Sequence, residues 1–206
     1  MSAKYVIKKL TLGDTNVGKS SIVLRFVSDK FDDKMFSTIG IDFKSKLIKV
    51  GNQSIKVLLW DTAGQEKFQN IAKQYYNGAN GVFLIFDITD KKSFERIDFW
   101  LQELKEHIRL DELHVVLVGN KIDNENKRVI KYEEANEYAE KNNVKYYEVS
   151  AKTTKGLNTL FNETIKEATK KVISKMDQND SDYYDKLRLS ILDKKGNNQK
   201  ENKCCF

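Results

Sequence analysis

Apolar residues recur along this chain with two different spacings. Strand-like alternation or short apolar runs occupy residues 4–12, 41–50, 54–60, 82–86, 114–118 and 145–149. Helix-like spacing occupies residues 19–27, 93–109, 132–142 and 157–176. Only Gly51-Asn52-Gln53 separates the second strand from the third, which predicts an antiparallel hairpin. Because strands otherwise alternate with helices, we expect an α/β three-layer fold with a six-stranded, mostly parallel sheet flanked by about five helices.

Composition is typical of one soluble domain followed by a polar tail. Of the 206 residues, 40% are apolar and 32% are charged, and the longest apolar run, residues 82–86, is far shorter than the ~20 residues of a membrane-spanning helix. We therefore expect no transmembrane helix and no secretory signal. From Asp177 the sequence is rich in Asp, Asn, Lys and Ser, which predicts a folded domain over residues 1–176 and a flexible extension over 177–206.

The formal net charge of +6 lies on the predicted domain. The tail from residue 177 has six acidic and six basic residues and is neutral. No basic stripe with interleaved aromatic residues is present, so we expect scattered surface lysines and no nucleic-acid partner.

The first chemically specific segment lies between the first strand and the first helix. Gly13-Asp14-Thr15-Asn16-Val17-Gly18-Lys19-Ser20 has the spacing and the strand–loop–helix context of a phosphate-binding loop. Backbone N–H groups and a helix N-terminus form an anion site there. Lys19 would reach the β- and γ-phosphates of a nucleoside triphosphate, and Ser20 would offer its hydroxyl to Mg²⁺. The alternative is a glycine turn that caps a helix.

A second segment follows the third strand. Asp61 is expected at the C-terminal end of that strand, where ligands of open α/β sheets bind, and it suits Mg²⁺ held through water. Gly64 would bring a backbone N–H near the γ-phosphate, and Gln65 would orient the attacking water. The alternative is that Asp61 and Thr62 cap a helix beginning near Gln65.

The base is indicated by Asn120-Lys121-Ile122-Asp123, which follows an apolar strand. Asp123 can accept hydrogen bonds from N1–H and N2–H₂ of guanine, whereas adenine has no such donor pair and would leave the carboxylate unpaired. After the last strand, Ser150-Ala151-Lys152 would supply a backbone N–H for the guanine oxygen and an aliphatic stem beside the base. The tetrapeptide alone is equally typical of a polar turn, and Ser150-Ala151-Lys152 alone indicates no function.

With these segments in this order, the chain resembles the Rab family of Ras-like small GTPases over essentially its whole length, closest to secretory-pathway Rabs. The resemblance also rests on Thr38-Ile39-Gly40-Ile41-Asp42-Phe43, Trp60-Asp61-Thr62-Ala63-Gly64-Gln65-Glu66, Tyr75-Tyr76-Asn77-Gly78-Ala79 and Lys127-Arg128-Val129. It implies a P-loop NTPase-like fold that binds GTP or GDP, with Ser20, Thr38 and Asp61 at Mg²⁺ and Gln65 in hydrolysis. The nucleotide-binding residues it implies are Gly13, Asp14, Thr15, Asn16, Val17, Gly18, Lys19, Ser20, Ser21, Phe31, Thr38, Gly64, Asn120, Lys121, Asp123, Ser150, Ala151 and Lys152.

The resemblance further implies partners. We expect the chain to be a monomer that binds an exchange factor, a GTPase-activating protein, effectors, a Rab escort protein and a GDP-dissociation inhibitor. The effector surface would include Ile39, Gly40, Phe43, Trp60 and Tyr75. For the aromatic residues Phe43, Trp60 and Tyr75, the alternative is ordinary core packing.

The C-terminus ends in Cys204-Cys205-Phe206. Adjacent cysteines offer no disulfide framework and no metal-ligand spacing, which indicates the reducing cytosol. The ending resembles the double-cysteine terminus of Rabs, which implies geranylgeranyl groups on Cys204 and Cys205 and cycling between the cytosolic face of secretory or endosomal membranes and the cytosol. An apolar group of Leu187, Leu189, Ile191 and Leu192 would either extend the last helix or dock on the escort protein and the dissociation inhibitor.

Four positions depart from the family pattern. Lys67 and Asn77 stand where Rabs usually carry arginine, and Thr15 and Asn16 replace smaller residues. Asn tolerates a left-handed backbone, so we expect the loop to form. Because Thr15 lies beside the γ-phosphate and would slow hydrolysis, a nucleotide-bound scaffold that does not hydrolyse GTP is the alternative to a GTPase, and a P-loop kinase is a more distant one.

Overall fold

The computed structural model describes residues 3–34, 38, 40–62, 75–109 and 113–176. The chain divides into two compact units, residues 1–169 and 170–206. The sheet and the helices packed on it belong to the first unit, except that the last helix continues past residue 169 into the second. Within the described part of the chain, no helix is both long enough and apolar enough to cross a bilayer.

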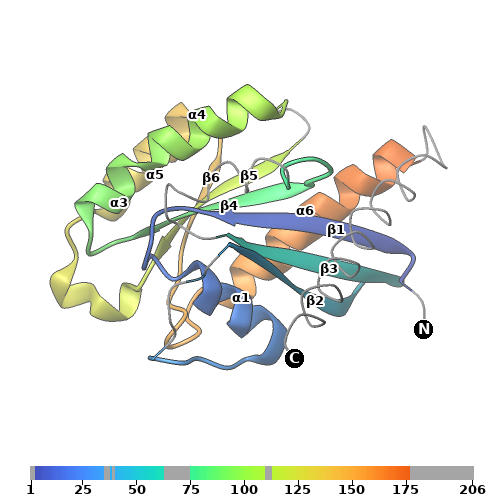
Figure 1. The fold of residues 1–206 in the computed structure, drawn as a ribbon, viewed down its shortest axis with the longest axis horizontal. Coiled ribbons are helices and arrows are strands. Elements are labelled where there is room, and N and C mark those ends of the chain that lie inside the picture. Colours follow the sequence, from blue (N-terminus) through green and yellow to red (C-terminus); the bar gives the residue numbers. More distant parts are fainter. Residues whose placement is uncertain (1–2, 35–37, 39, 63–74, 110–112, 177–206) are drawn as a thin grey trace, which may run out of the picture. The chain divides into compact units, whose positions relative to one another are not determined.

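Six strands form one sheet in the order β2-β3-β1-β4-β5-β6 (Figure 1). The strands are β1 (Tyr5–Leu12), β2 (Ile41–Val50), β3 (Gln53–Thr62), β4 (Gly81–Asp87), β5 (His114–Asn120) and β6 (Lys145–Glu148). The hairpin partners β2 and β3 are antiparallel, and every other neighbouring pair is parallel. The predicted mixed, mostly parallel six-stranded sheet is therefore confirmed.

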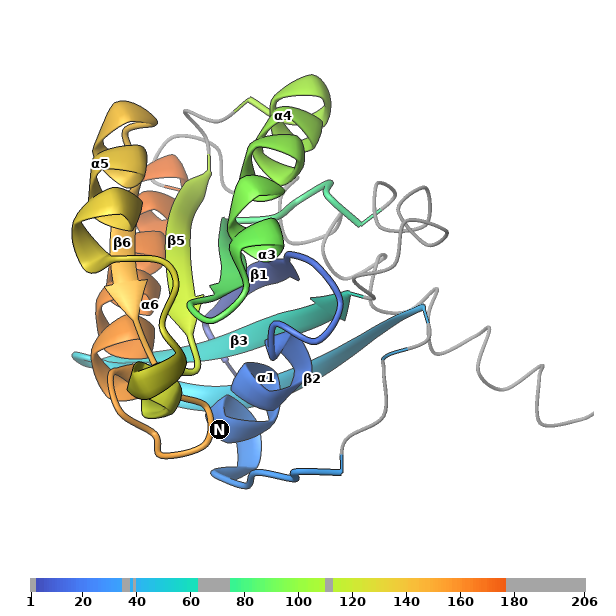
Figure 2. The same cartoon turned by 90° about the vertical axis from the view of Figure 1, so that its left-hand side faces the viewer.

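Helices cover both faces of this sheet (Figure 2). They are α1 (Lys19–Ser28), α3 (Lys91–Glu95), α4 (Ile97–His107), α5 (Tyr132–Lys141), α6 (Leu157–Met176) and the 3-10 helix η3 (Ile122–Lys127). Side chains along β4 alternate between these two faces. Phe83 contacts Phe161 of α6, with ring centroids 6.4 Å apart, and Phe86 contacts Phe94 of α3 at 4.8 Å. Strand side chains three positions apart point to opposite faces, so β4 is covered on both sides.

The single helix predicted over residues 93–109 is wrong in detail. It begins earlier, at Lys91, because the Asp90 side chain accepts a hydrogen bond from the backbone N–H of Lys92 at 3.0 Å and caps it. It is also divided at Arg96 into α3 and α4. The buried positions Ile97 and Trp100 continue the apolar spacing across this junction, so the hydrophobic pattern alone could not reveal it.

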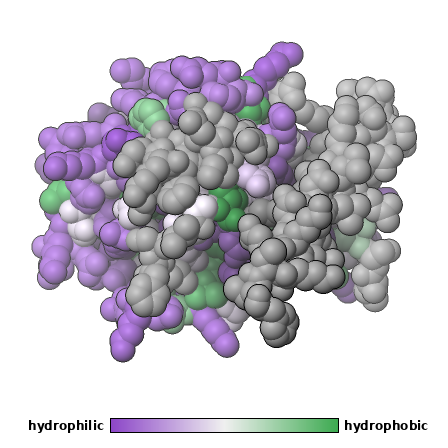
Figure 3. All heavy atoms as spheres, viewed as in Figure 1, coloured by the Kyte–Doolittle hydropathy of each residue, from purple (hydrophilic) through white to green (hydrophobic). Residues whose placement is uncertain are grey.

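The surface of the described residues is predominantly hydrophilic on the face seen in Figure 3, with small separate apolar patches. Among the described residues, the interior includes lysines of β1 that the pattern did not predict. Lys9 of β1 is 0% exposed, and its ammonium lies 4.6 Å from the Phe83 ring centroid. Burial lowers the pKa of Lys9 to about 7, while the nearby Glu167 carboxylate acts in the opposite direction.

Candidate nucleotide-binding site

Loops that follow β1, β5 and β6 surround a cavity of about 370 Å³. Its lining residues are Thr15, Asn16, Gly18, Lys19, Ser20, Ser21, Phe31, Asp32, Asp33, Thr38, Asn120, Lys121, Asp123, Asn124, Ala151 and Lys152. Three segments distant in sequence thus meet at the carboxyl ends of parallel strands, where open α/β sheets bind ligands. Of the residues expected at a nucleotide, Gly13, Asp14, Val17 and Ser150 are not in the lining.

The loop between β1 and α1 requires glycine at two positions. Gly13 has φ 144° and Gly18 has φ 94°. A Cβ on Gly13 would lie 2.1 Å from the Ile85 carbonyl oxygen of β4, and one on Gly18 would lie 2.3 Å from the Asn120 side-chain nitrogen. Asn16 has φ 65°, so the loop forms with asparagine in a left-handed conformation, as its known tolerance predicts. The positive φ values, and the lack of room for a Cβ, together explain why both positions are glycine.

Lys19 lies at the start of α1 and points back into the loop. Its Nζ donates to the backbone carbonyls of Gly13 at 3.0 Å and Asp14 at 2.7 Å. The side chain is buried, and burial lowers the pKa of Lys19 to about 8, although the carboxylates of Asp61 and Asp14 act in the opposite direction. An ammonium held by two carbonyls at the floor of a cavity is positioned to meet an anion there.

Three oxygen-bearing side chains from separate segments lie beside Lys19. The hydroxyls of Ser20 and Thr38 share a hydrogen bond of 2.6 Å, and the Thr38 hydroxyl donates to Asp61 Oδ2 at 3.2 Å. Asp61 is 7% exposed, and its buried Oδ1 has no hydrogen-bond partner among the residues that the structure describes. Burial raises the pKa of Asp61. Two hydroxyls and a carboxylate with a spare oxygen are the hard ligands that suit Mg²⁺.

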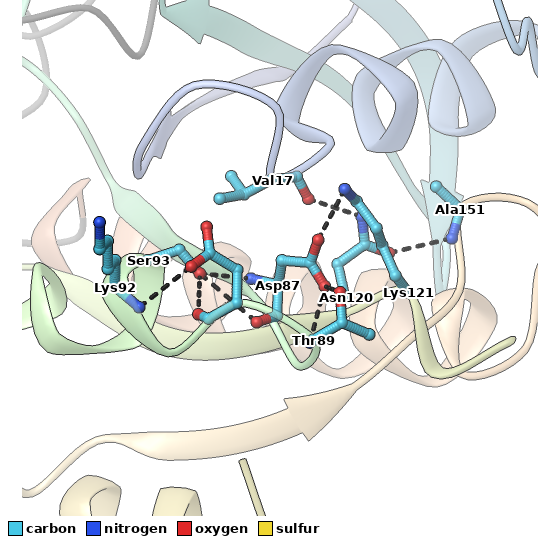
Figure 4. A network of polar contacts seen from close by, with 9 residues as sticks. Val17, Asp87, Thr89, Lys92, Ser93, Asn120, Lys121 and Ala151 are labelled. Atoms are coloured by element: carbon cyan, nitrogen blue, oxygen red, sulfur yellow. Dashed lines mark hydrogen bonds and ion pairs between the residues drawn. The ribbon is translucent and has the colours of Figure 1, made fainter. Parts of the chain in front are cut away.

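Asn120 joins the three segments of the cavity (Figure 4). It ends β5 and is 1% exposed. Its side-chain nitrogen donates to the Val17 carbonyl at 2.8 Å, and its side-chain oxygen accepts from the Ala151 backbone N–H at 3.1 Å. A buried amide with both ends engaged fixes the loops it connects.

Asp123 and Lys121 follow Asn120 and point to different partners. Asp123 Oδ1 accepts from the Ser150 hydroxyl at 2.6 Å, which orients the exposed carboxylate. Lys121 has φ 69°, and its ammonium lies 2.7 Å from Asp87 Oδ2 at the end of β4. Lys121 is one of the residues that line the cavity, and Figure 4 shows its side chain reaching toward Asp87.

Phe31, an aromatic lining residue of the cavity, lies beside an arginine of α1. The Arg25 guanidinium lies 5.6 Å from the Phe31 ring centroid. Arg25 also donates to the backbone carbonyls of Ala151 and Lys152, each at 2.7 Å. It therefore ties α1 to the segment after β6 and supports Phe31 at the rim.

The structure adds site residues that the sequence-based expectations did not include. Asp32, Asp33 and Asn124 line the cavity. Arg25 and Asp87 hold lining residues, and Arg96 and Trp100 donate hydrogen bonds to Asp14 of the phosphate loop. Asp87 directly follows the apolar run of β4, the same signal that marked Asp61, so it could have been found. Arg25 and Trp100 lie within helices and Arg96 lies at the junction of α3 and α4, and nothing in their spacing distinguishes them from ordinary surface or core positions.

The expected effector residues form a contact cluster rather than an open aromatic surface. The Phe43 and Trp60 rings stack with centroids 5.1 Å apart, and Trp60 meets Tyr75 at 4.8 Å. Trp60 is 0% exposed, so the expectation that all three rings are displayed at the surface is wrong for Trp60. It is packed between its two neighbours and beneath Lys8, whose ammonium lies 4.7 Å from the Trp60 ring. Phe43, Tyr75 and Gly40 are partly exposed.

Several expected functional residues lie outside the described residues. They are Ile39, Gly64, Gln65, Lys67, Cys204, Cys205 and the apolar group Leu187, Leu189, Ile191 and Leu192.

Comparison with known proteins gives concordant results. The sequence model of the Ras family matches residues 8–170. The chain is 44% identical over 158 residues to "Ras-related protein SEC4" of Candida albicans, covering 77% of this chain and 75% of that protein. It is 41% identical over 172 residues to "GTP-binding protein ypt2" of Schizosaccharomyces pombe, covering 84% and 86%. It is also 41% identical over 176 residues to "Ras-related protein Rab-1" of Theileria parva, covering 85% and 79%.

Proposed function

Because this chain belongs to the Ras family, where its relatives are of the Rab type, we propose that it is a molecular switch of membrane trafficking whose GTP and GDP forms bind different partners. As a Ras-family protein it binds guanine nucleotide and is a GTPase that works with regulators and effectors. We propose further which residues perform these tasks, which cation the site holds, and how the protein attaches to a membrane.

The cavity at the ends of β1, β5 and β6 is the observation that supports the proposal most strongly. Its volume of about 370 Å³ is within the range of small-ligand sites. At one end, backbone N–H groups and Lys19 suit phosphates. At the other, Asp123 presents a carboxylate suited to the donor edge of guanine, with Phe31 and Lys152 in the lining.

The cation would lie where Ser20, Thr38 and Asp61 converge. Mg²⁺ there would neutralise phosphate charge and draw Thr38 towards the γ-phosphate. Asp61 Oδ1, for which the described part of the chain offers no hydrogen-bond donor, would accept from cation-bound water. Loss of the γ-phosphate would release Thr38, and this change would distinguish the two forms.

Hydrolysis would depend on Gln65, which we propose orients the attacking water. Single-turnover hydrolysis of GTP by the purified protein, with ATP as the matched nucleotide, tests the assignment. We expect Gln65→Leu to bind GTP as the parent does but to hydrolyse it at least 10-fold more slowly. Equal rates would remove Gln65 from the reaction. No GTP turnover by the parent, alone or with a GTPase-activating protein, would support the scaffold that does not hydrolyse GTP.

We further propose that Cys204 and Cys205 carry geranylgeranyl groups, added with an escort protein and shielded by a dissociation inhibitor. A single lipid chain gives only marginal binding, whereas two anchor stably. Fractionation of cells expressing Cys204→Ser, Cys205→Ser or both would test this. The double variant should leave the membrane fraction completely, and its salt-resistant retention would show that the anchor lies elsewhere.

A further inference from the structure

One carboxylate of the phosphate loop is held by two donors from a different layer of the fold. Asp14 Oδ1 accepts from Arg96 Nε at 2.9 Å and from Trp100 Nε1 at 3.1 Å. Arg96 is the residue at which α3 gives way to α4, and Trp100 lies one turn later in α4. Residues four apart lie on the same side of a helix, so both donors face the loop together.

Burial differs among the three partners. Trp100 is 1% exposed, and the indole N–H needs an acceptor in that position, which Asp14 provides. The Asp14 side chain is 21% exposed and the Arg96 side chain 44% exposed. Arg96 also lies over the Phe99 ring, with its guanidinium 5.0 Å from the centroid. Trp100 therefore fixes where the carboxylate lies, and Arg96 supplies the opposite charge.

That carboxylate lies next to the phosphate end of the cavity. The backbone carbonyl of Asp14 accepts a hydrogen bond from Lys19 Nζ at 2.7 Å, and the following residue, Thr15, lines the cavity. An uncompensated negative charge here would repel a triphosphate and compete with it for Lys19. Arg96 is the cation that the described structure pairs with Asp14.

We propose that Arg96 is a positioning residue for the nucleotide, which neutralises Asp14 and holds the Thr15 side of the phosphate loop in its binding conformation. This inference rests on the proposed function, because it presumes that the cavity takes a nucleoside triphosphate. Arg96 acts through Asp14 and not by touching the nucleotide. Because GTP carries one more negative charge than GDP, losing Arg96 should weaken GTP binding more than GDP binding.

Dissociation of fluorescent GTP and GDP analogues from four purified proteins tests the inference. These are the parent, Arg96→Ala, Asp14→Asn/Arg96→Ala, and Lys92→Ala as the matched control. Lys92 lies one turn before Arg96, and its exposed side chain has the same charge. Thermal unfolding of each protein, with and without nucleotide, shows whether the variants fold.

We expect Arg96→Ala to release GTP about 5-fold faster and GDP no more than about 2-fold faster. The effect should be of this modest size because Asp14 loses one ion-pair partner that is partly exposed to solvent. Asp14→Asn should restore GTP release to within about 2-fold of the parent, because Asn removes the repelling charge and keeps an acceptor for Trp100. Lys92→Ala should resemble the parent.

Equal acceleration of GTP and GDP release, or no recovery in the double variant, would overturn the inference and indicate a purely structural contact. The same rates for Arg96→Ala and Lys92→Ala would also overturn it. Failure of the parent to bind either analogue would instead overturn the proposed nucleotide site, so the two failures are distinguishable.

Discussion

The side-chain nitrogen of Asn120 donates to the backbone carbonyl of Val17 at 2.8 Å, joining residues 103 positions apart in the chain. The other end of the same amide holds the backbone N–H of Ala151. The phosphate loop and the two segments beside the base are thereby held at fixed separation by one buried side chain. This relationship accounts for a preformed cavity and gives the first prediction.

Asn120→Ala should accelerate the release of both GTP and GDP by at least 10-fold. It leaves the Val17 carbonyl and the Ala151 N–H without their partner, and each such loss costs about 1–3 kcal/mol in a buried position. Dissociation rates of fluorescent nucleotides provide the measurement. Asn136→Ala, which removes only an exposed hydrogen bond to Glu140, is the control. Similar rates for the two variants would contradict the proposed role of Asn120.

Gly18→Ala should abolish tight nucleotide binding. The backbone there has φ 94°, and the added Cβ would lie 2.3 Å from the Asn120 side-chain nitrogen, so Asn120 would have to move. Gly51→Ala is the matched control, since Gly51 has φ 59° with no atom within 4 Å of the added Cβ. The control should lose only about 1 kcal/mol of stability and keep its nucleotide affinity. Measurement of nucleotide affinity and thermal unfolding for both variants separates local strain from displacement of Asn120.

Much of this site could be predicted because its signals are local. The loop from Gly13 to Ser20 carries its own spacing, and Asp61 and Asn120 each end a strand with a polar residue after an apolar run. The contacts that support it could not be predicted in the same way. Arg25 and Arg96 act through pairings with distant segments, and a helical charge pattern does not say which distant partner it meets. The burial of Trp60 depends likewise on distant segments, which supply the rings of Phe43 and Tyr75 and the side chain of Lys8.

Lys9 gives a prediction about stability. Its ammonium is fully buried in β1, and the charged group that acts on it is Glu167 of α6, which itself pairs with His114 of β5 and Lys145 of β6. The pKa of Lys9 is lowered to about 7 in the folded protein from 10.5. Between these values the unfolded chain binds more protons, so the free energy of unfolding should rise from pH 7 to pH 10.

Lys9→Met should remove that rise and stabilise the protein at pH 7 by about 1–4 kcal/mol, because an apolar side chain costs less to bury than an ammonium. Urea unfolding at pH 7, 8 and 9 measures both effects. Lys105→Met, at an exposed position of α4, makes the same substitution without removing a buried ammonium, so it should keep the parent's pH dependence. A destabilised Lys9→Met protein, or one with the parent's pH dependence, would contradict this account.

The central claim is that the cavity recognises guanine through Asp123. Competition of GTP, ATP and xanthosine triphosphate against a fluorescent guanine nucleotide, measured for the parent and for Asp123→Asn, tests it most directly. The account predicts that the parent prefers GTP to ATP by at least about 100-fold, as expected when a bound base covers a polar group and would otherwise leave it unpaired. It also predicts that Asp123→Asn loses at least 10-fold in GTP affinity and gains affinity for xanthosine triphosphate, whose 2-oxo group accepts where guanine donates. An unchanged order of preference in Asp123→Asn would contradict the claim and remove Asp123 from the base site.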